Sequence, residues 1–484
     1  MKTKSIAKNF FYDLFYRILT LIIPLITAPY ISRVIGAEGI GNYSYTQSIC
    51  SYFTLFAVLG SNVYGQREIA FRREDDTART KAFWEIMVIR TIFILLSALC
   101  YSTVIIQSTG VIRVLFLIQM VDIVGLLFDI TWLIQGVEDF GLIFYRNLII
   151  KGLSVASIFL FVKTEQDLYL YVLLTSLAVI IGNISLWLQL RKYIVKIKVK
   201  ELHPRKHLGP ILALFLPTIA LRLYDVLGKT LLGYIGKDAE ENGYYEQALK
   251  IVTMAITIVT SLGNVMSPRM AYLHVQKDTE QLKKYFDISF DVVMILALPI
   301  SVGLLTVADN LVPWFFGMDF LKVATLLKYI SVICVAMGLK NLIGLQYLVS
   351  TNRQNSYTLS IVIGLIINVI ISIILIPKYS SVGTVVASVI SEYIIVAVQL
   401  YMIRKEISVW PLIKGSFSKI VACIGMGIVL WFVAGKLVSG IVNTCILVII
   451  GAAVYGIILV VLRDKTVKYV FEKILCKIRS HKNR

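Results

Sequence analysis

Charged residues are scarce in this sequence, and no stretch between its apolar runs is long enough to form a folded soluble domain. Asp, Glu, Lys and Arg make up 16% of the 484 residues, whereas 58% are hydrophobic and the mean hydropathy is +0.80. A soluble globular protein has roughly 25% charged residues. Continuous apolar runs of about 20 residues recur from end to end, and each is long enough to cross a bilayer core. We therefore predict an all-α polytopic membrane protein.

Histidine and cysteine are also few, and they lack the spacing of a metal or redox site. We therefore expect neither a metal nor a cofactor. The sequence has no Walker A loop, no nucleophile elbow and no paired histidines. Asp122 and Asp129 could be the acids of a membrane glycosyltransferase, but such enzymes normally need a sizeable non-membrane region or a metal-binding loop. Neither is found here, so the sequence predicts a protein that is not an enzyme.

The apolar runs predict about fourteen membrane-spanning helices. Their ranges are roughly 10–34, 42–65, 82–106, 114–135, 142–162, 168–190, 209–235, 244–268, 285–308, 323–348, 357–376, 382–403, 416–435 and 441–462.

Lys and Arg are distributed very unevenly between the two sides of this predicted bundle. With the N-terminus in the cytoplasm, the cytoplasmic connections hold about 33 of them and the outer connections about six, which is the positive-inside bias. We therefore place both termini in the cytoplasm. The net charge of +19 then reflects topology and attraction to anionic membrane lipids, and nucleic acid is not an expected partner.

The longest basic connection divides the predicted helices into sets. We expect an N-terminal six-helix lobe (1–190), a cytoplasmic basic linker (191–208), a C-terminal six-helix lobe (209–405), a final helix pair (406–462) and a basic cytoplasmic tail (463–484). The segments "VIGAEGIGNYSYTQ" (34–47) and "YIGKDAEENGYYEQ" (234–247) occupy matching places in the two lobes and are similar, because both run Ile-Gly, an acidic loop, Gly, then Tyr and Gln. Because six is even, such lobes have the same orientation and form a parallel repeat, as in alternating-access transporters.

Several predicted spans contain ionisable side chains, each of which costs at least ~2.5–3.5 kcal/mol near the bilayer centre. Arg222, Asp225 and Lys229 lie on one face of a single helix at about 100° per residue. Such a stripe cannot face lipid, and cations slightly outnumber anions over all spans. We infer a hydrated, slightly cationic cavity that suits an anionic head group such as phosphate or pyrophosphate. The cations we assign to it are Arg17, Arg90, Lys151, Arg222, Lys229 and Lys250.

Two of the charged sets also have a simpler interpretation. Asp13 with Arg17, and Glu246 with Lys250, are spaced four residues apart on their helices. Such pairs can neutralise each other. They also lie near span ends, where long side chains can reach the headgroups.

Two segments of the chain resemble the Wzx-type polysaccharide flippases of the multidrug/oligosaccharidyl-lipid/polysaccharide exporter superfamily. They are "PLITAPYISRVIGAEGIGNYSYTQSI" (24–49) and "WLIQGVEDFGLIFYRNLIIK" (132–151). The resemblance implies two six-helix lobes around a central cavity that works by alternating access. It further implies that an undecaprenyl-pyrophosphate-linked oligosaccharide repeat unit moves from the inner to the outer leaflet of a bacterial cytoplasmic membrane. The product would be a surface polysaccharide of capsule, O-antigen or teichoic-acid type.

The resemblance also implies roles for the charged residues. Arg222 and Lys229 would hold the pyrophosphate, and Asp225 would weaken that binding or take part in ion coupling. Without an ATPase, the drive would be a gradient of H+ or Na+, or consumption of the product by a polymerase and other assembly proteins. The candidate ion carriers are Asp13, Asp122, Asp129, Asp225, Glu246 and Glu392. The alternative is an ion-coupled multidrug/cation antiporter of the same superfamily, in which an acidic residue would dominate the cavity.

Overall fold

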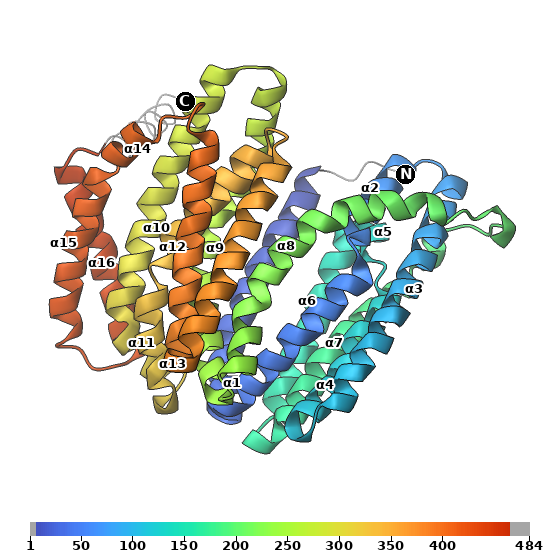
Figure 1. The fold of residues 1–484 in the computed structure, drawn as a ribbon, viewed down its shortest axis with the longest axis horizontal. Coiled ribbons are helices and arrows are strands. Elements are labelled where there is room, and N and C mark those ends of the chain that lie inside the picture. The colour runs from blue at the N-terminus through green and yellow to red at the C-terminus, as the bar shows by residue number, and fades with distance from the viewer. Residues whose placement is uncertain (1–5, 465–484) are drawn as a thin grey trace, which may run out of the picture. The chain divides into compact units, whose positions relative to one another are not determined.

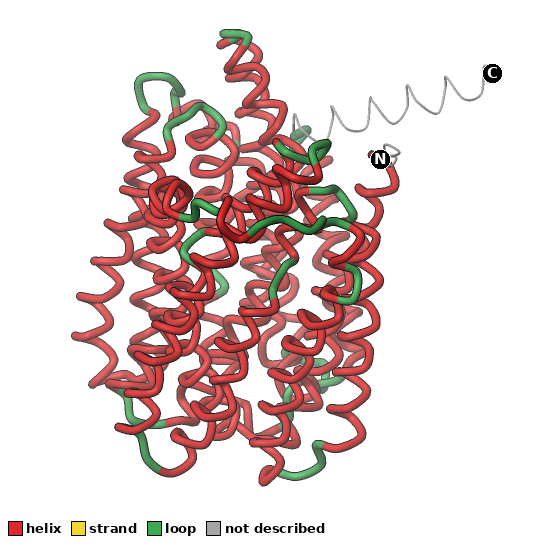
Figure 2. The backbone as a smooth tube through the Cα atoms, turned by 90° about the vertical axis from the view of Figure 1, so that its right-hand side faces the viewer, coloured by secondary structure: helices red, strands yellow, loops and turns green. Residues whose placement is uncertain are grey.

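The computed structural model describes residues 6–464, without the side chains of 6–21, 199, 216–218, 262 and 264–265. All regular secondary structure in this described range is helical (Figures 1 and 2). The all-α prediction is therefore confirmed. Contacts divide the chain into two compact units, residues 1–243 and residues 244–484.

The first unit contains helices α1 to α8, joined by short connections and single 3₁₀ turns. The helices are α1 (Ile6–Val58), α2 (Ser61–Phe71), α3 (Asp76–Gln107), α4 (Gly110–Gly125), α5 (Thr131–Gly136), α6 (Phe140–Phe161), α7 (Leu168–Trp187) and α8 (Arg205–Ile235).

The second unit contains most of α9 and all the helices that follow. They are α9 (Ala239–Val275), α10 (Thr279–Phe315), α11 (Leu321–Ile330), α12 (Ile333–Lys340), a π-helix (Asn341–Val349), α13 (Gln354–Ile403), α14 (Val409–Gly415), α15 (Phe417–Ala434) and α16 (Ile441–Val461).

Many of these helices are suited to a bilayer. Eight helices among the described residues are long and apolar enough to cross a membrane, and up to eleven if three bent helix pairs each count as one span. The prediction of a multi-pass membrane protein is therefore confirmed. The number of about fourteen spans, the parallel repeat and the cytoplasmic termini stay predictions.

Kinks divide the two longest helices. The 53-residue α1 is interrupted at Gly36, whose φ of 74° is a conformation that glycine adopts without steric cost. The 50-residue α13 is interrupted at Ser380, three residues after Pro377. Both kinks fall where the hydropathy pattern separates two predicted spans.

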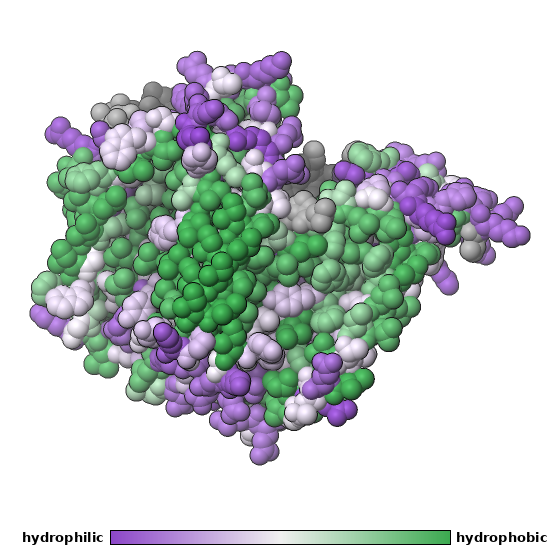
Figure 3. Space-filling view, viewed as in Figure 1, coloured by the Kyte–Doolittle hydropathy of each residue, from purple (hydrophilic) through white to green (hydrophobic). Residues whose placement is uncertain are grey.

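Helix α13 shows how the sequence divides lipid-facing from interior positions. Ile366, Ile370 and Ile373 are more than half exposed, and they repeat at helical spacing on one face. Asn368 and Ser372 are buried on the opposite face, where Asn368 donates a hydrogen bond to the Ser391 hydroxyl. In Figure 3, hydrophobic side chains cover the middle of the helices on this side of the second unit, and hydrophilic ones gather at their ends. This distribution is typical of a surface in contact with lipid.

The two similar segments noted in the sequence pack against each other within the first unit. A Cβ atom at Gly41 would lie 1.6 Å from the backbone oxygen of Ala239. A Cβ atom at Gly243 would lie 2.1 Å from the backbone oxygen of Ala37. Both positions therefore require glycine, because backbone atoms cannot rotate away. This contact packs the part of α1 that follows the kink at Gly36 closely against the start of α9.

Candidate functional site

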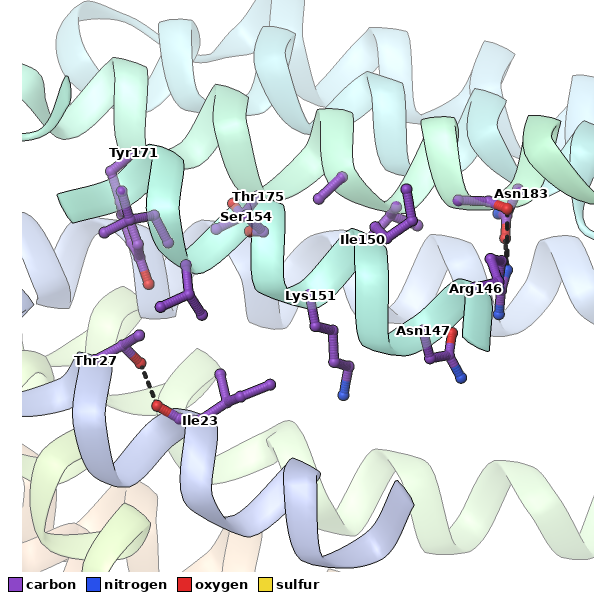
Figure 4. A pocket seen from close by; sticks show the side chains of 15 residues that line it. Ile23, Thr27, Arg146, Asn147, Ile150, Lys151, Ser154, Tyr171, Thr175 and Asn183 are labelled. Atoms are coloured by element: carbon purple, nitrogen blue, oxygen red, sulfur yellow. Dashed lines mark hydrogen bonds between the residues drawn. The ribbon is translucent and has the colours of Figure 1, made fainter. Parts of the chain in front are cut away.

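A pocket of about 350 Å³ with a mixed polar and aliphatic lining lies between α1, α6 and α7, within the first unit (Figure 4). Among the described residues that line it are two cations, amide and hydroxyl side chains and several aliphatic ones, and none of these described residues is a carboxylate. The lining residues are Ile23, Thr27, Arg146, Asn147, Ile150, Lys151, Ser154, Val155, Ile158, Tyr171, Thr175, Ala178, Val179, Gly182 and Asn183. These described side chains can donate and accept hydrogen bonds to a hydroxyl-rich or anionic ligand.

Helical spacing explains why one side of α6 is polar. Asn147, Lys151 and Ser154 follow each other at intervals of four and three residues, so they share a face. Tyr171 and Thr175 are four residues apart on α7, so they also share a face of their helix. Each helix thus brings a polar stripe to the pocket, while its other faces are apolar.

The two cations of the pocket are held differently. Arg146 donates a hydrogen bond of 3.1 Å to the Gly182 oxygen and one of 3.5 Å to Asn183 Oδ1, which fixes it against α7. Lys151 extends with Asn147 from α6 into the space toward α1, as Figure 4 shows. The structure therefore places the predicted cation Lys151 in a pocket and adds Arg146 to it.

A second predicted cation, Arg90 of α3, lies in a buried network instead. It is 1% exposed, and its guanidinium donates to the Ser61 hydroxyl at 2.9 Å and to the Asn62 side chain. Asp129 lies 3.2 Å away and forms its ion pair. The Trp132 ring lies 6.0 Å from the guanidinium carbon. This arrangement favours a structural role for Arg90 and Asp129, because a ligand would have to displace every partner.

In the second unit, a predicted carboxylate also belongs to a cross-helix ion pair. Glu392 of α13 is 2% exposed and accepts a hydrogen bond of 2.5 Å from the Lys340 ammonium at the end of α12. Glu246 and Lys250 lie half-buried on α9 of the same unit, where further contacts engage both.

Asp122 of α4 differs from these carboxylates. It is half-buried in the first unit, and a side-chain hydrogen bond connects it to Ser176 of α7. Cys50 of α1 and Tyr101 of α3 lie near enough to interact electrostatically with its carboxylate. Among the described residues, no ion pair of Asp122 is found, so it is a carboxyl in a mainly hydroxyl and thiol environment.

The charged stripe predicted on α8 is present, and it lies on a helix that packs against α1 in the first unit. Arg222 and Asp225 are exposed, and Lys229 is half-buried. The next residue, Thr230, bonds to the Tyr52 hydroxyl at 2.7 Å and donates to Ser48 at 2.8 Å. Asp13 and Arg17 belong to α1, but their side chains fall outside the described residues.

Sequence reasoning missed a buried network at the end of the first unit that carries the basic linker. His207 is 1% exposed, with its Nδ1 2.7 Å from the Tyr64 hydroxyl and its Nε2 2.8 Å from Glu85 Oε2. Glu85 also accepts a 2.8 Å hydrogen bond from the His203 backbone. Burial and the hydrogen bond to Asp139 raise the pKa of the Tyr193 hydroxyl in the same linker. The only signal in the sequence was the presence of His203 and His207 within one basic segment.

Metal binding has no support in the described part of the chain, where no group of three or more His, Cys, Asp and Glu could hold an ion.

Comparisons with known proteins match both halves of the chain. The family model described as polysaccharide biosynthesis protein matches residues 6–274, and the one described as lipid II flippase MurJ matches residues 149–451. A putative O-antigen transporter of Escherichia coli K12 is 21% identical over 409 residues, which cover 83% of this chain and 97% of that protein. The probable low-salt glycan biosynthesis flippase Agl15 of Haloferax volcanii is 22% identical over 185 residues, 37% of each chain.

Solved structures share the fold. An inward closed lipid II flippase MurJ superposes with a TM-score of 0.71 at 17% identity, covering 95% of this chain and 99% of that one. An inward-facing multidrug resistance transporter of the MATE family superposes with a TM-score of 0.61 at 15% identity, covering 81% and 99%. At such low identities these likenesses describe the fold alone.

Proposed function

The chain belongs to the polysaccharide biosynthesis protein family, and we propose that it is a flippase for lipid-linked oligosaccharide. The resemblance to Wzx-type polysaccharide flippases is thereby confirmed. The matched lipid II flippase family and the O-antigen transporter are not enzymes, which agrees with the prediction that this chain is not one. The proposed substrate is an undecaprenyl-pyrophosphate-linked repeat unit, moved from the inner to the outer leaflet of a bacterial cytoplasmic membrane. It would supply a surface polysaccharide of capsule, O-antigen or teichoic-acid type.

The polar pocket in the first unit is the observation that carries this proposal. A sugar head group cannot cross hydrocarbon unaided, because every hydroxyl that loses water without a new partner costs roughly 2–7 kcal/mol. The amides and hydroxyls of α6 and α7 supply such partners inside a helical unit with an apolar surface. The prenyl tail has no such need and can stay in the lipid. Exposure of the site to one membrane face at a time would complete alternating access.

We assign the pyrophosphate to Arg222 and Lys229 of α8, with Asp225 between them to moderate its binding. Arginine offers bidentate hydrogen bonds to phosphate oxygens and lysine a point charge. The two halves of α8, Arg205–Phe215 and Ile219–Ile235, are bent by 54° relative to each other. Pro217 lies between these halves, and a proline there favours a bend.

Coupling to an ion gradient is the proposed drive, with H+ or Na+ as the ion. Asp129 pairs with the buried Arg90 and Glu392 with the half-buried Lys340, so a change in the protonation of either carboxylate would break an ion pair. Asp122 hydrogen-bonds a serine and is the carboxyl we favour as the ion carrier. Removal of the product by a polymerase and other assembly proteins would add to the drive.

The alternative function, a multidrug/cation antiporter, requires a site that attracts cations. Among the described residues that line the pocket, Arg146 and Lys151 are cations and none is a carboxylate, which favours the flippase over a cation antiporter. The shared fold with the MATE transporter does not distinguish the two functions.

Depletion of the protein in cells tests the proposal. Lipid-linked repeat units would be labelled or digested from outside, and the protected fraction would be extracted. We expect protected units to accumulate on depletion, and wild type but not Arg222→Ala to restore their exposure. Lys436→Ala is the matched control, because Lys436 is an exposed cation in the connection before α16. Normal exposure without the protein, in a strain with no redundant flippase, would refute the proposal.

A further inference from the structure

We propose that the basic linker of the first unit, residues 191–208, binds the head groups of anionic phospholipids. Seven of its residues are Lys or Arg, and Glu201 is its only acidic residue. The linker begins three residues after the end of α7, which belongs to a candidate membrane span. A cluster of about four to eight cations directly beside a membrane helix is typical of segments that bind anionic lipids. The structure shows which of these cations are exposed and how the linker is held.

Most of the cations of the linker are open to solvent. Five of the seven are exposed, and no ion pair of these five is found in the described part of the chain: Arg191, Lys196, Lys198, Lys200 and Arg205. The other two pair with carboxylates of the first unit. Glu201 also has a partner, because it lies 2.5 Å from the Lys81 ammonium of α3. The single carboxylate of the linker is therefore engaged, and the five exposed cations can meet phosphate groups.

Hydrogen bonds to α3 hold the linker at two places. The Val195 backbone nitrogen donates to the Thr80 hydroxyl at 3.0 Å, and the His203 backbone nitrogen donates to Glu85 at 2.8 Å. Residues 196–202, which we call the arm, lie between these two contacts. In Figure 1 the arm belongs to the green loop that extends sideways beyond α3. Because both ends are fixed, the arm presents its lysines with little further loss of conformational freedom.

The attachment to α3 places the linker at the polar end of a membrane helix. Helix α3 is a candidate span, and its residues 76–85, which hold the linker, are mostly polar, whereas apolar residues follow from Ile86. Aliphatic side chains at the start of the linker are also exposed, with Leu188 at 82% and Val195 at 41%. Exposed aliphatic side chains next to lysines are typical of segments that lie between head groups and acyl chains.

A phospholipid surface fits these features better than an acidic protein does. Lysine is a point charge on a flexible stem, so it can bind phosphate without a fixed partner geometry. Its aliphatic stem can lie along apolar surface while the ammonium group stays at the head groups. An acidic protein would pair with the cations but would leave Leu188 and Val195 uncovered. The exposed aliphatic side chains therefore favour the lipid.

Acetylation of lysines tests this proposal on the full-length protein in nanodiscs. One set of nanodiscs contains phosphatidylcholine alone, and the other adds an equal amount of phosphatidylglycerol. Peptide mass spectrometry gives the rate at each lysine. We expect Lys196, Lys198 and Lys200 to react about fivefold more slowly with phosphatidylglycerol, which corresponds to about 1 kcal/mol for each cation near an anionic surface. Salt at about 1 M should remove the difference.

Lys277 is the control lysine for this measurement. It is exposed in the turn between α9 and α10, and Figure 1 shows this turn beyond the ends of the neighbouring helices of the second unit. The attraction to an anionic surface falls off within a Debye length, so the rate at Lys277 should change less than about twofold.

A triple variant measures what the arm contributes to lipid binding. Phosphatidylglycerol should raise the thermal unfolding temperature of wild type above its value in phosphatidylcholine. Lys196→Gln, Lys198→Gln and Lys200→Gln together should unfold like wild type in phosphatidylcholine and lose this increase, whereas arginine at the same positions should keep it. The matched control removes the same charge from exposed positions of the second unit and should keep the increase: Lys277→Gln, Lys283→Gln and Lys284→Gln together.

Three results would overturn the proposal. Equal acetylation rates of the arm lysines with both lipids would mean that the linker does not contact the head groups, and an acidic protein would become the candidate partner. A full increase in unfolding temperature for the glutamine variant would show that the arm is not needed. An equal loss in the control variant would mean that the total charge of the protein, and not the arm, attracts the lipid.

Discussion

Replacing Gly41 with alanine should destabilise the first unit, because the contact between α1 and the start of α9 has no room for a methyl group. The new Cβ would lie 1.6 Å from the Ala239 oxygen and 2.9 Å from the Gly243 nitrogen. An ordinary contact needs at least 3.4 Å, so the two segments would have to separate by about 1.8 Å. Both obstacles are backbone atoms, and no side-chain rotation can relieve the clash.

The size of the effect follows from two opposing terms. Overpacking typically costs about 1–3 kcal/mol, and a backbone clash belongs at the upper end. Alanine favours the helix over glycine by up to about 1 kcal/mol. The net loss should therefore be roughly 2 kcal/mol. The Cβ atom added by Gly243→Ala would lie 2.1 Å from the Ala37 oxygen, so this variant should be destabilised to a similar extent.

Thermal unfolding of the purified protein in detergent measures this loss. Gly152→Ala is the matched control, because no atom lies within 4 Å of the Cβ that it adds to α6. That variant should be as stable as wild type or slightly more stable. If Gly41→Ala unfolds at the temperature of Gly152→Ala, the two segments are not packed as described, and the reasoning is wrong.

Three further predictions concern buried charges and the linker. Arg90→Met should lower the free energy of unfolding by up to about 3 kcal/mol, since it leaves the half-buried Asp129 carboxylate without its partner; combination with Asp129→Leu should recover most of the loss in thermal unfolding. Glu85→Ala should release residues 191–208 and speed their cleavage by trypsin, measured against wild type under native conditions. Lys419→Met should destabilise the second unit, because the 1% exposed lysine pairs with two carboxylates, and an unchanged unfolding temperature would contradict that role.

Hydropathy and local spacing predicted much of the fold. The apolar runs located the membrane helices, and the kinks at Gly36 and Ser380 lie at the predicted breaks between spans. The similar segments 34–47 and 234–247 contain the two glycines of one tight contact. The sequence shows a glycine in each segment, but the steric reason for it follows only from how the two segments pack against each other.

The pairing of charges could not be predicted from the sequence. A spacing of four residues predicts which side chains share a face of one helix, such as Glu246 and Lys250, because the helical period is fixed. Arg90 and Asp129 are 39 residues apart, and their contact depends on how α3 meets the segment after α4. The polar stripe at Asn147 and Lys151 was present in the sequence at helical spacing, but only the packing of α6 against α7 identified it as part of a pocket.

A charged side chain within a membrane helix can therefore either stabilise the fold or bind a ligand. The groups around that side chain determine which of the two it does. Arg90 donates to a serine, an asparagine and an aspartate, so its charge is neutralised and hydrogen-bonded within the protein. Lys151 lines a pocket together with Arg146 and extends into its space toward α1, where it can contact a ligand. Replacement of the first should change stability and spare substrate preference, and replacement of the second should do the reverse. The same sequence signal, a cation in an apolar run, thus divides into two roles that stability and transport measurements can separate.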